Sequence, residues 1–311
     1  MSLRPRSDPA AVNITGAERA TGLSKDTLRV WERRYGFPSP DRDDSGERLY
    51  SPAQIERLRL LKRLVDAGER PGRLMELSTQ ELEQRVQAYP APAAGGRSSP
   101  DVEEFLRVLL SHDVEAFRRQ LGRARERLGL AAFVTDVVAP LNTRVGDAWM
   151  RGQLQVFQEH LYTESVQVVL RDAIARVPPP ARDARPRVLL TTLAHEPHAL
   201  GLLMAEALMA LEGARCISLG TGTPLWDIVL AAKAQQAEIV ALSFSGYLSP
   251  GQVVEGLTEL RAKLPAGTEL WSGGAAPVLH RRPVPGVRVM GEIGQIRGAL
   301  AAWRARSTDR P

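Results

Sequence analysis

The sequence has little of what marks a secreted, membrane or disulfide-rich protein. Among 311 residues it holds one cysteine, Cys216, which excludes a disulfide framework and any cluster of cysteine metal ligands. No apolar run approaches the roughly 20 residues that a membrane helix requires. The first residues, MSLRPRSDPAA, lack the apolar segment of a secretory signal. We therefore expect a cytoplasmic protein with no membrane partner.

The charge balance is only mildly basic. The chain has 41 Lys and Arg residues against 36 Asp and Glu residues, a formal net charge of +5. This excess permits a polyanionic partner but does not require one. With 43% hydrophobic and 25% charged residues, the chain can bury a core and is not disordered as a whole. A length of 311 residues suits two or three domains.

Two segments rich in proline and small residues divide the chain. Residues 88–100 (AYPAPAAGGRSSP) lose nearly all bulky apolar residues and are typical of a semi-flexible tether, and residues 178–186 (PPPARDARP) form a second break. The predicted division is an N-terminal domain over residues 1–89, a linker over 90–100, a helical domain over 101–178, a linker over 179–186, a third domain over 187–306 and a tail over 307–311.

The N-terminal block has the pattern of a winged helix-turn-helix. Residues 14–20 favour a short helix, and residues 24–35 (SKDTLRVWERRY) favour a second one that begins at Ser24, whose hydroxyl can accept an orphan backbone N–H. Leu28 and Trp31 would face inward, and the outer side is basic. A helix, a tight turn and a basic second helix make the geometry that enters a major groove. The stretch between Gly36 and Tyr50 has the right size for a two-stranded wing.

Residues 12–75 closely resemble the DNA-binding domain of the MerR family of transcription regulators. The resemblance rests on the run LRVWERRYG over residues 28–36, on RLY over residues 48–50 and on apolar residues of the next helix. It implies binding to double-stranded DNA: Thr27 and Arg29 at base edges, Arg33 and Tyr35 on phosphates, and Arg48 and Tyr50 bracing the wing on the backbone. The alternative for each arginine is a solvated surface with ordinary ion pairs.

The residues after this block differ from those of many MerR-type regulators, which dimerise through a long helix at this point. Here Leu74, Leu77, Leu82 and Val86 support only a short helical region, too short for a stable coiled coil. Such domains normally read pseudo-palindromic DNA sites as dimers. We therefore expect a homo-oligomer, a dimer or a tetramer, held through the C-terminal two-thirds of the chain.

From residue 187 onward, short apolar runs alternate with helical stretches. The runs are residues 188–193, 216–219, 239–244, 269–271 and 287–290. The alternation predicts a flavodoxin- or Rossmann-like, doubly wound parallel sheet with helices on both faces, and ligands bind such sheets outside the carboxyl ends of the strands. Cys216 is expected in a buried strand, and Trp226 and Trp271 in the core.

One motif follows the first predicted strand directly. Glu196-x-His198-x-x-Gly201 lies in the strand-to-helix loop, where an imidazole nitrogen can bind a metal while the carboxylate holds the other ring nitrogen. Gly201 would let a bulky group approach the backbone. Small residues at neighbouring strand ends, Ser243 and the pair Gly273 and Gly274, would open a slot into the sheet.

This constellation resembles the cobalamin-binding domain of methionine synthase, mutases and related proteins, whose signature is Asp-x-His-x-x-Gly, then Ser-x-Leu, then Gly-Gly. The resemblance implies that His198 is the lower cobalt ligand, that Glu196 is its partner, and that Ser243, Gly273 and Gly274 line the channel for the dimethylbenzimidazole tail. Two residues depart from it: Glu196 replaces Asp, and Ser245 replaces Leu. The alternative is a flavodoxin-like domain with an empty or different site.

The middle block is helical by its apolar periodicity and predicts a small bundle. It contains Trp149, nine further residues and then Glu159 and His160. This spacing resembles the helical cap of CarH and LitR proteins, which implies that Trp149 covers the upper face of cobalamin beside the adenosyl group, with Glu159 and His160 near that group. Taken alone, Trp149 would be a core residue. Met150 stands where several light-sensing relatives carry a His.

The whole chain resembles the cobalamin-dependent, MerR-type regulators of the CarH and LitR class over about residues 12–305. The resemblance implies a multidomain α and α/β protein that is not an enzyme and that binds adenosylcobalamin. It further implies repression in the dark, released when light cleaves the cobalt–carbon bond. Three alternatives stay open: a cobalamin sensor that ignores light, as Met150 would suit; a regulator without cobalamin; and a corrinoid carrier for methyl transfer or a mutase subunit, which the DNA-binding block disfavours.

Overall fold

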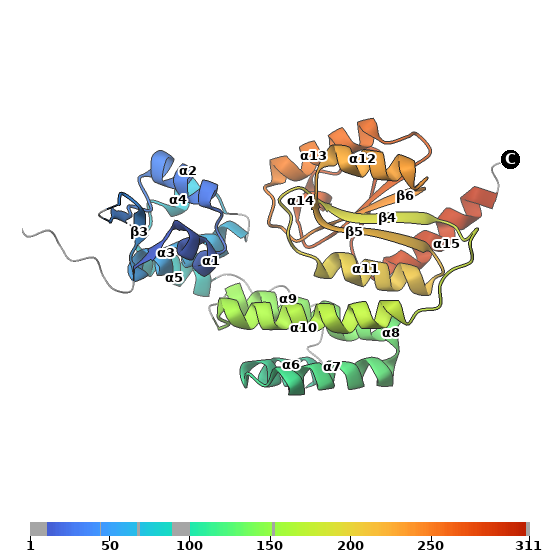
Figure 1. Ribbon diagram of the computed structural model, residues 1–311, viewed down its shortest axis with the longest axis horizontal. Helices are drawn as coiled ribbons and strands as arrows, with labels where there is room; N and C mark the ends of the chain where they lie inside the picture. The colour runs from blue at the N-terminus through green and yellow to red at the C-terminus, as the bar shows by residue number, and fades with distance from the viewer. Residues whose placement is uncertain (1–10, 44, 67–68, 89–99, 151–152, 309–311) are drawn as a thin grey trace, which may run out of the picture. The chain divides into compact units, whose positions relative to one another are not determined.

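The computed structural model describes residues 11–43, 45–66, 69–88, 100–150 and 153–308 (Figure 1). The chain forms two compact units. The N-terminal unit comprises Met1–Gly95 together with Gly146–Val156, and the C-terminal unit comprises Gly96–Val145 together with Phe157–Pro311. Among the described residues, none of the helices is both long and apolar enough to cross a membrane.

The N-terminal unit contains the predicted helix-turn-helix. Both helices begin at a polar cap: the Asn13 side chain accepts from the Gly16 N–H, and the Ser24 side chain accepts from the Thr27 N–H. Both end at a glycine in the left-handed region, Gly22 and Gly36, with φ of 72° and 70°. The helices of this unit are α1 (Ile14–Thr21), α2 (Lys25–Tyr35), α3 (Pro52–Asp66), α4 (Pro71–Leu74) and α5 (Thr79–Gln87).

The predicted wing is present, with one strand more than the sequence indicated. Strands β2 (Asp41–Arg42) and β3 (Arg48–Tyr50) pair antiparallel, and β1 (Val12–Asn13) joins the other side of β3. The core under this sheet is built from β3 and all five helices of the unit. The side chains without exposed surface are Ala17, Leu28, Tyr50, Leu58, Leu61, Leu64, Leu74 and Leu82.

The first part of the C-terminal unit is the expected helical bundle (Figure 1). Its members are α6 (Pro100–Leu110), α7 (Val114–Leu128), the short α8 (Leu130–Ala132), the π-helix η1 (Phe133–Val138), α9 (Ala139–Met150) and α10 (Val156–Ala175). The last turn of α9, from Gly146, and the first residue of α10 belong to the N-terminal unit. The aromatic rings of Phe105, Phe117 and Tyr162 pack edge-on or tilted against each other, with centroids 6.2 Å apart. All three side chains are buried, so the bundle has a core of its own.

The second part is the predicted parallel sheet, in the order β5-β4-β6-β7-β8. The strands are β4 (Arg187–Leu193), β5 (Arg215–Thr223), β6 (Ile239–Phe244), β7 (Glu269–Gly274) and β8 (Val287–Met290). Figure 1 shows helices on both faces. On one face lie α11 (Leu200–Leu211) and α15 (Gln295–Thr308), and on the other α12 (Leu225–Ala234), α13 (Pro250–Lys263) and α14 (Val278–Arg281).

The bundle and the sheet belong to the same unit, and α11 lies between them. Helix α11 contacts α8 and η1 on its bundle side. The Asn142 amide nitrogen is 3.7 Å from the Met204 sulfur, and Met204 lies in α11. The layer of α11 therefore fixes the bundle against the sheet.

Two predictions about buried residues are wrong. Cys216 is only half-buried, because its strand, β5, lies at the edge of the sheet and has no fully buried residue. Trp271 is buried in β7, as expected, but Trp226 is 60% exposed on α12. The reason is the angular position of each residue on that helix. Ile228, Val229 and Ala232 face the sheet and are buried, whereas Trp226 and Leu230 lie on the opposite side, where the Lys263 ammonium approaches the Trp226 ring to 4.2 Å.

Candidate functional site

The predicted motif lies where the order of the strands in the sheet reverses direction. From β4 the chain moves outward to β5 and then returns to β6 on the other side of β4. In open parallel sheets, ligands bind in the crevice that such a reversal leaves at the carboxyl ends of the strands. The loop after β4 carries Glu196 and His198, and the loop after β6 carries Ser245. The site therefore lies between β4 and β6.

Glu196 and His198 are in direct contact. The His198 Nδ1 atom is 2.7 Å from Glu196 Oε1. Glu196 is fully buried, whereas the His198 side chain is 51% exposed. No hydrogen bond of His198 Nε2 is found within the described part of the chain. The arrangement holds one ring nitrogen against a carboxylate and presents the other to the outside.

The carboxylate of Glu196 remains charged although it is buried. Burial by itself raises the pKa of a carboxyl group, but hydrogen bonds from His198 and Ser245 outweigh that effect and hold the pKa of Glu196 below its ordinary value. The Ser245 N–H donates to Glu196 Oε2 at 3.0 Å, and its hydroxyl lies 2.9 Å from Glu196 Oε1. A charged carboxylate accepts a hydrogen bond from His198 Nδ1, which favours the ring tautomer that carries its proton on Nδ1.

Gly201 and Ser243 bring α11 close to the end of β6. A Cβ atom on Gly201 would lie 2.4 Å from the Ser243 hydroxyl, so only glycine fits without a shift. Ser243 is paired in register with Gly273, and Phe244 with Gly274. A Cβ atom on Gly274 would lie 2.1 Å from the Phe244 carbonyl oxygen. The structure thus places Gly201 of α11 against Ser243 of β6, and Ser243 and Phe244 opposite Gly273 and Gly274 of β7.

The three predicted cap residues are divided between the two units. Trp149 belongs to the N-terminal unit, where its ring lies 5.9 Å from the Lys62 ammonium and 5.9 Å from the Arg63 guanidinium. Glu159 and His160 belong to the C-terminal unit and lie side by side at 3.6 Å on α10. Thr163 donates to Glu159 at 2.7 Å. The convergence of Trp149 with Glu159 and His160 stays a prediction.

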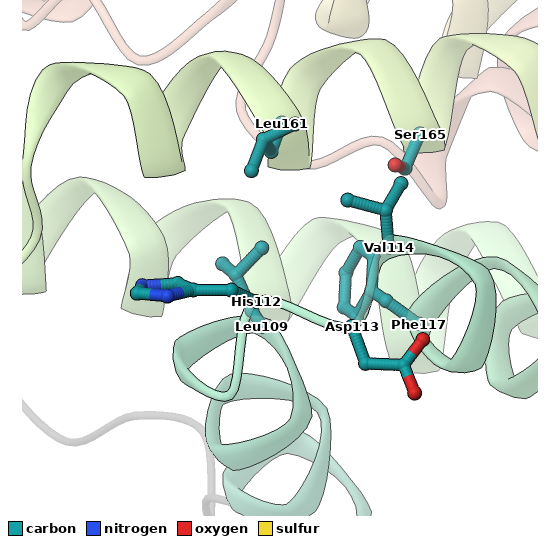
Figure 2. Close-up of a pocket in the computed structure, with 7 residues that line it drawn as sticks. All are labelled: Leu109, His112, Asp113, Val114, Phe117, Leu161 and Ser165. Atoms are coloured by element: carbon teal, nitrogen blue, oxygen red, sulfur yellow. The ribbon is translucent and has the colours of Figure 1, made fainter.

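Figure 2 shows a hollow elsewhere in the bundle, between the α6–α7 turn and α10. Its lining is mainly apolar: Leu109, His112, Asp113, Val114, Phe117, Leu161 and Ser165. The His112 side chain already has partners within the protein. Its Nε2 lies 2.9 Å from the Gln158 amide, and its ring centroid lies 5.5 Å from that of Phe157. Asp113 caps α7 by accepting from the Ala116 N–H. These contacts explain the polar residues there, and the hollow is not a candidate site.

Of the predicted DNA-contacting residues of α2, Thr27 and Tyr35 are half-buried, and Tyr35 packs against the core of the unit. Arg29 and Arg33 are exposed, and Arg29 pairs with Asp26 at 3.2 Å. The Thr27 hydroxyl is 2.8 Å from that of Ser24. The Arg34 guanidinium lies over the Tyr35 ring, 5.4 Å from its centroid. The outer side of α2 is therefore basic and accessible to a polyanion.

The two predicted wing residues differ in accessibility. The Arg48 Nε–H donates to Glu32 Oε2 at 2.8 Å, which ties the wing to α2. Tyr50 has no exposed surface, and its hydroxyl is buried with no partner within the described ranges. Direct contact between Tyr50 and a DNA phosphate disagrees with this burial. Tyr50 is therefore a core residue, and its side chain packs on the buried side of β3.

Comparison with known proteins connects this geometry to a family. A family model described as MerR HTH family regulatory protein matches residues 12–78. A second, described as B12 binding domain, matches residues 102–171. The chain is 31% identical over 278 residues to the HTH-type transcriptional repressor CarH of Myxococcus xanthus, which covers 87% of this chain and 90% of that protein. The chain belongs to the CarH family of MerR-type transcription regulators.

A second relative agrees with this assignment, and one solved structure shares the fold. The HTH-type transcriptional repressor CarA of Myxococcus xanthus is also 31% identical, over 82% of this chain and 84% of its own length. The monomethylamine corrinoid protein of Methanosarcina barkeri has 13% identity and a TM-score of 0.54, covering 66% of this chain and 100% of that one. The latter match shows the fold alone. As a CarH-family member, the chain is a DNA-binding transcription regulator with a B12-binding domain, and its named relatives are regulators rather than enzymes.

The donors at the carboxyl ends of β4 and β6 fit a corrin-held cobalt. Neutral imidazole nitrogen is a common ligand for such metals, and a carboxylate on the other ring nitrogen is the usual partner of a metal-binding His. His198 and Glu196 have this relation. Among the described residues no group of three or more His, Cys, Asp and Glu side chains could hold a bare metal ion. A single protein ligand suits a metal that brings its own macrocycle.

Sequence analysis missed one residue of this site. Ser245 was noted only as a departure from the usual Leu, yet its side chain contacts both Glu196 and His198. The available signal was a second hydroxyl in the loop after β6, two residues beyond Ser243.

Proposed function

We propose that this CarH-family regulator is a repressor in the dark that uses adenosylcobalamin as its cofactor and is released from DNA by light. The observation that carries the proposal is the pairing of His198 Nδ1 with a buried carboxylate at the β4–β6 crevice, in a chain that also has an accessible basic recognition helix. The bound cofactor would supply a light-sensitive cobalt–carbon bond.

The chain's own residues hold the cofactor from both sides. His198 is the lower ligand and Glu196 its partner, while Gly201, Ser243, Gly273 and Gly274 line the tail slot. Trp149, Glu159 and His160 cover the upper face. This second set is supported by its spacing in the sequence and by the match of residues 102–171 to the B12-binding model.

Repression requires several DNA-binding units to act together. Linking two modules raises the effective concentration of the second and multiplies the affinity without new contacts. Helix α5 has only nine residues, which is short for a stable dimerisation helix. We therefore place the oligomer contacts in the C-terminal unit, where the bound cofactor can favour one assembly state over another. This preference for one state supplies the free energy of the switch.

The deciding experiment uses the full-length protein purified with adenosylcobalamin in darkness. Absorbance and size-exclusion profiles are recorded before and after green light, and operator binding is measured on the same samples. We expect a coloured dark oligomer that binds DNA, and a smaller species with weaker binding after illumination. A colourless preparation would refute the sensor function.

His198→Ala tests the cobalt ligand. We expect weaker cobalamin binding and a changed visible spectrum of the bound cofactor, because the axial nitrogen is lost. His280→Ala, a surface substitution on α14, is the matched control. If the spectrum and the affinity of His198→Ala were unchanged, His198 would not be the cobalt ligand.

Arg33→Ala tests the DNA interface. We expect weaker operator binding and a salt dependence lowered by about one phosphate contact, because this exposed arginine lies on the outer side of α2. Arg19→Ala, an exposed arginine of α1, makes the same change of charge away from the recognition helix. Equal effects of the two substitutions would show a loss of general charge rather than of a specific contact.

A second candidate is a cobalamin-responsive regulator that ignores light. Met150 favours it, since a thioether is a poor ligand for Co(III) and does not trap the illuminated cobalt as a His would. In that case the dark and illuminated size-exclusion profiles coincide, whereas preparations with and without cobalamin differ.

A further inference from the structure

The loops on the two sides of the β4–β6 crevice are joined through Ser245. We propose that Ser245 is a positioning residue for the cobalt ligand: its hydroxyl fixes the Glu196 carboxylate and the proton on His198 Nδ1, so that His198 Nε2 keeps a free lone pair. The inference rests on the proposed role of His198 as ligand and adds a third residue to that pair.

Ser245 makes more contacts with this pair than any other residue described in the loops. Its backbone N–H donates to Glu196 Oε2 at 3.0 Å. Its hydroxyl oxygen lies 2.9 Å from Glu196 Oε1, 3.1 Å from Glu196 Oε2 and 2.9 Å from His198 Nδ1. It also accepts from the Tyr247 N–H at 3.2 Å. One hydroxyl thus connects the loop after β4 with the loop after β6.

The direction of each hydrogen bond follows from counting protons. A charged carboxylate only accepts, and a serine hydroxyl has one proton and two lone pairs. The Ser245 proton therefore goes to Glu196, and its lone pairs are left for the Tyr247 N–H and for His198 Nδ1. Both neighbours of Nδ1, Glu196 and Ser245, then act as acceptors. The ring proton must be on Nδ1, and Nε2 is the unprotonated nitrogen.

The hydroxyl is important because Glu196 is fully buried. A buried carboxylate is stable only while its lone pairs are occupied by donors. The donors described here are His198, through Nδ1 and a 3.3 Å contact from its N–H, and Ser245, through its N–H and its hydroxyl. Removing the hydroxyl deletes one donor and leaves the carboxylate free to turn, and with it the ring that it holds. An apolar residue at position 245 could not supply this contact.

The first test compares cobalamin affinity between variants of the full-length protein. We expect Ser245→Ala to weaken adenosylcobalamin binding about tenfold, the lower end of the range for removing a partner of a metal ligand, because Glu196 and the backbone N–H remain. Ser245→Thr keeps a hydroxyl and should restore most of the affinity. Ser272→Ala removes a buried hydroxyl of β7 that has no partner among the described residues, and it should leave affinity unchanged.

The second test reads the His198 ring without any cofactor. Protein labelled with ¹⁵N-histidine reports which ring nitrogen carries the proton, and His198→Ala assigns the signals. We expect the Nδ1–H form alone in the unaltered chain and in Ser245→Thr, and a mixture of forms in Ser245→Ala. If Ser245→Ala does not fold, Ser245→Val against Ser245→Thr makes the same comparison at nearly equal volume.

Two results would overturn the proposal. One is an affinity and a ring signal in Ser245→Ala equal to those of the unaltered chain. The other is that Ser245→Thr and Ser245→Val have the same adenosylcobalamin affinity and the same His198 ring signal. Failure of the proposed function is distinct: the unaltered chain would then bind no adenosylcobalamin, while the ring signal would still report whether Ser245 holds the Nδ1–H form.

Discussion

Gly201→Ala separates the stability of the sheet from its capacity to hold a cofactor. The added Cβ would lie 2.4 Å from the Ser243 hydroxyl and 3.6 Å from the Ser243 Cβ. Only the first contact is too short. Relieving it costs about 1–3 kcal/mol, as overpacking generally does. Alanine in a helix is favoured over glycine by about 0.5–1 kcal/mol. The net loss of stability is therefore expected to be about 0–2 kcal/mol.

The double variant Gly201→Ala with Ser243→Ala isolates the clash. Without the hydroxyl, the two Cβ atoms stand 3.6 Å apart, an ordinary contact. We therefore expect the double variant to be more stable than Ser243→Ala alone by about 0.5–1 kcal/mol, the helix preference of alanine. The coupling between the two sites is then about 1–3 kcal/mol, the cost of the clash in the single variant.

The two variants should change the affinity for cobalamin in a different way from the free energy of unfolding. The methyl group would occupy the proposed tail slot between α11 and β6 in both variants, so affinity should fall by about tenfold or more, as expected for 1–3 kcal/mol of overpacking. Stability is measured by urea denaturation with far-ultraviolet circular dichroism, and affinity by absorbance titration. Gly298→Ala, where an added Cβ meets nothing within 4 Å, is the control. Unchanged affinity in Gly201→Ala would refute the assignment of the slot.

Two further outcomes are expected. Gly274→Ala should destabilise the C-terminal unit by about 2 kcal/mol or more in the same urea assay, since its Cβ would meet the Phe244 carbonyl oxygen at 2.1 Å and its φ of 112° disfavours any side chain; a change below about 0.5 kcal/mol would contradict this. Burial raises the pKa of Cys216 to about 12, so at pH 8 iodoacetamide should label the folded protein at least about a hundredfold more slowly than the urea-unfolded protein, and equal rates would show that the thiol is accessible.

Much of the fold could be predicted because its signals are local. The Ser24 side chain caps the start of the recognition helix and the left-handed backbone of Gly36 ends it, and the strands over residues 239–244 and 287–290 were predicted at their observed bounds. The small residues at the strand ends could be named because parallel strands end at one edge. These features depend on residues within a few positions of each other or on a repeated pattern.

The features that escaped prediction depend on contacts distant in sequence. Trp226 has a core residue's chemistry, and only the direction of α12 over the sheet shows that it faces outward. Tyr50 matched a family position for DNA contact, yet packing in the apolar core of the N-terminal unit buries it. The contact of Ser245 with Glu196 spans 49 positions. No periodicity in one sequence reports such a pairing.

The π-helix η1 has a consequence for how this architecture can be altered. Its hydrogen bonds span one residue more than those of an α-helix, so the stretch Phe133–Val138 accommodates an extra residue without a break in the chain. Deleting a single residue there would let this stretch close to an ordinary α-helix while the later side chains of α9, Asn142 and Trp149 included, kept their facing. The same deletion within the α-helical part of α9, ahead of Trp149, would instead turn the indole by about 100° around the axis, so the π stretch is the place in this bundle where a one-codon deletion changes the facing of the indole least.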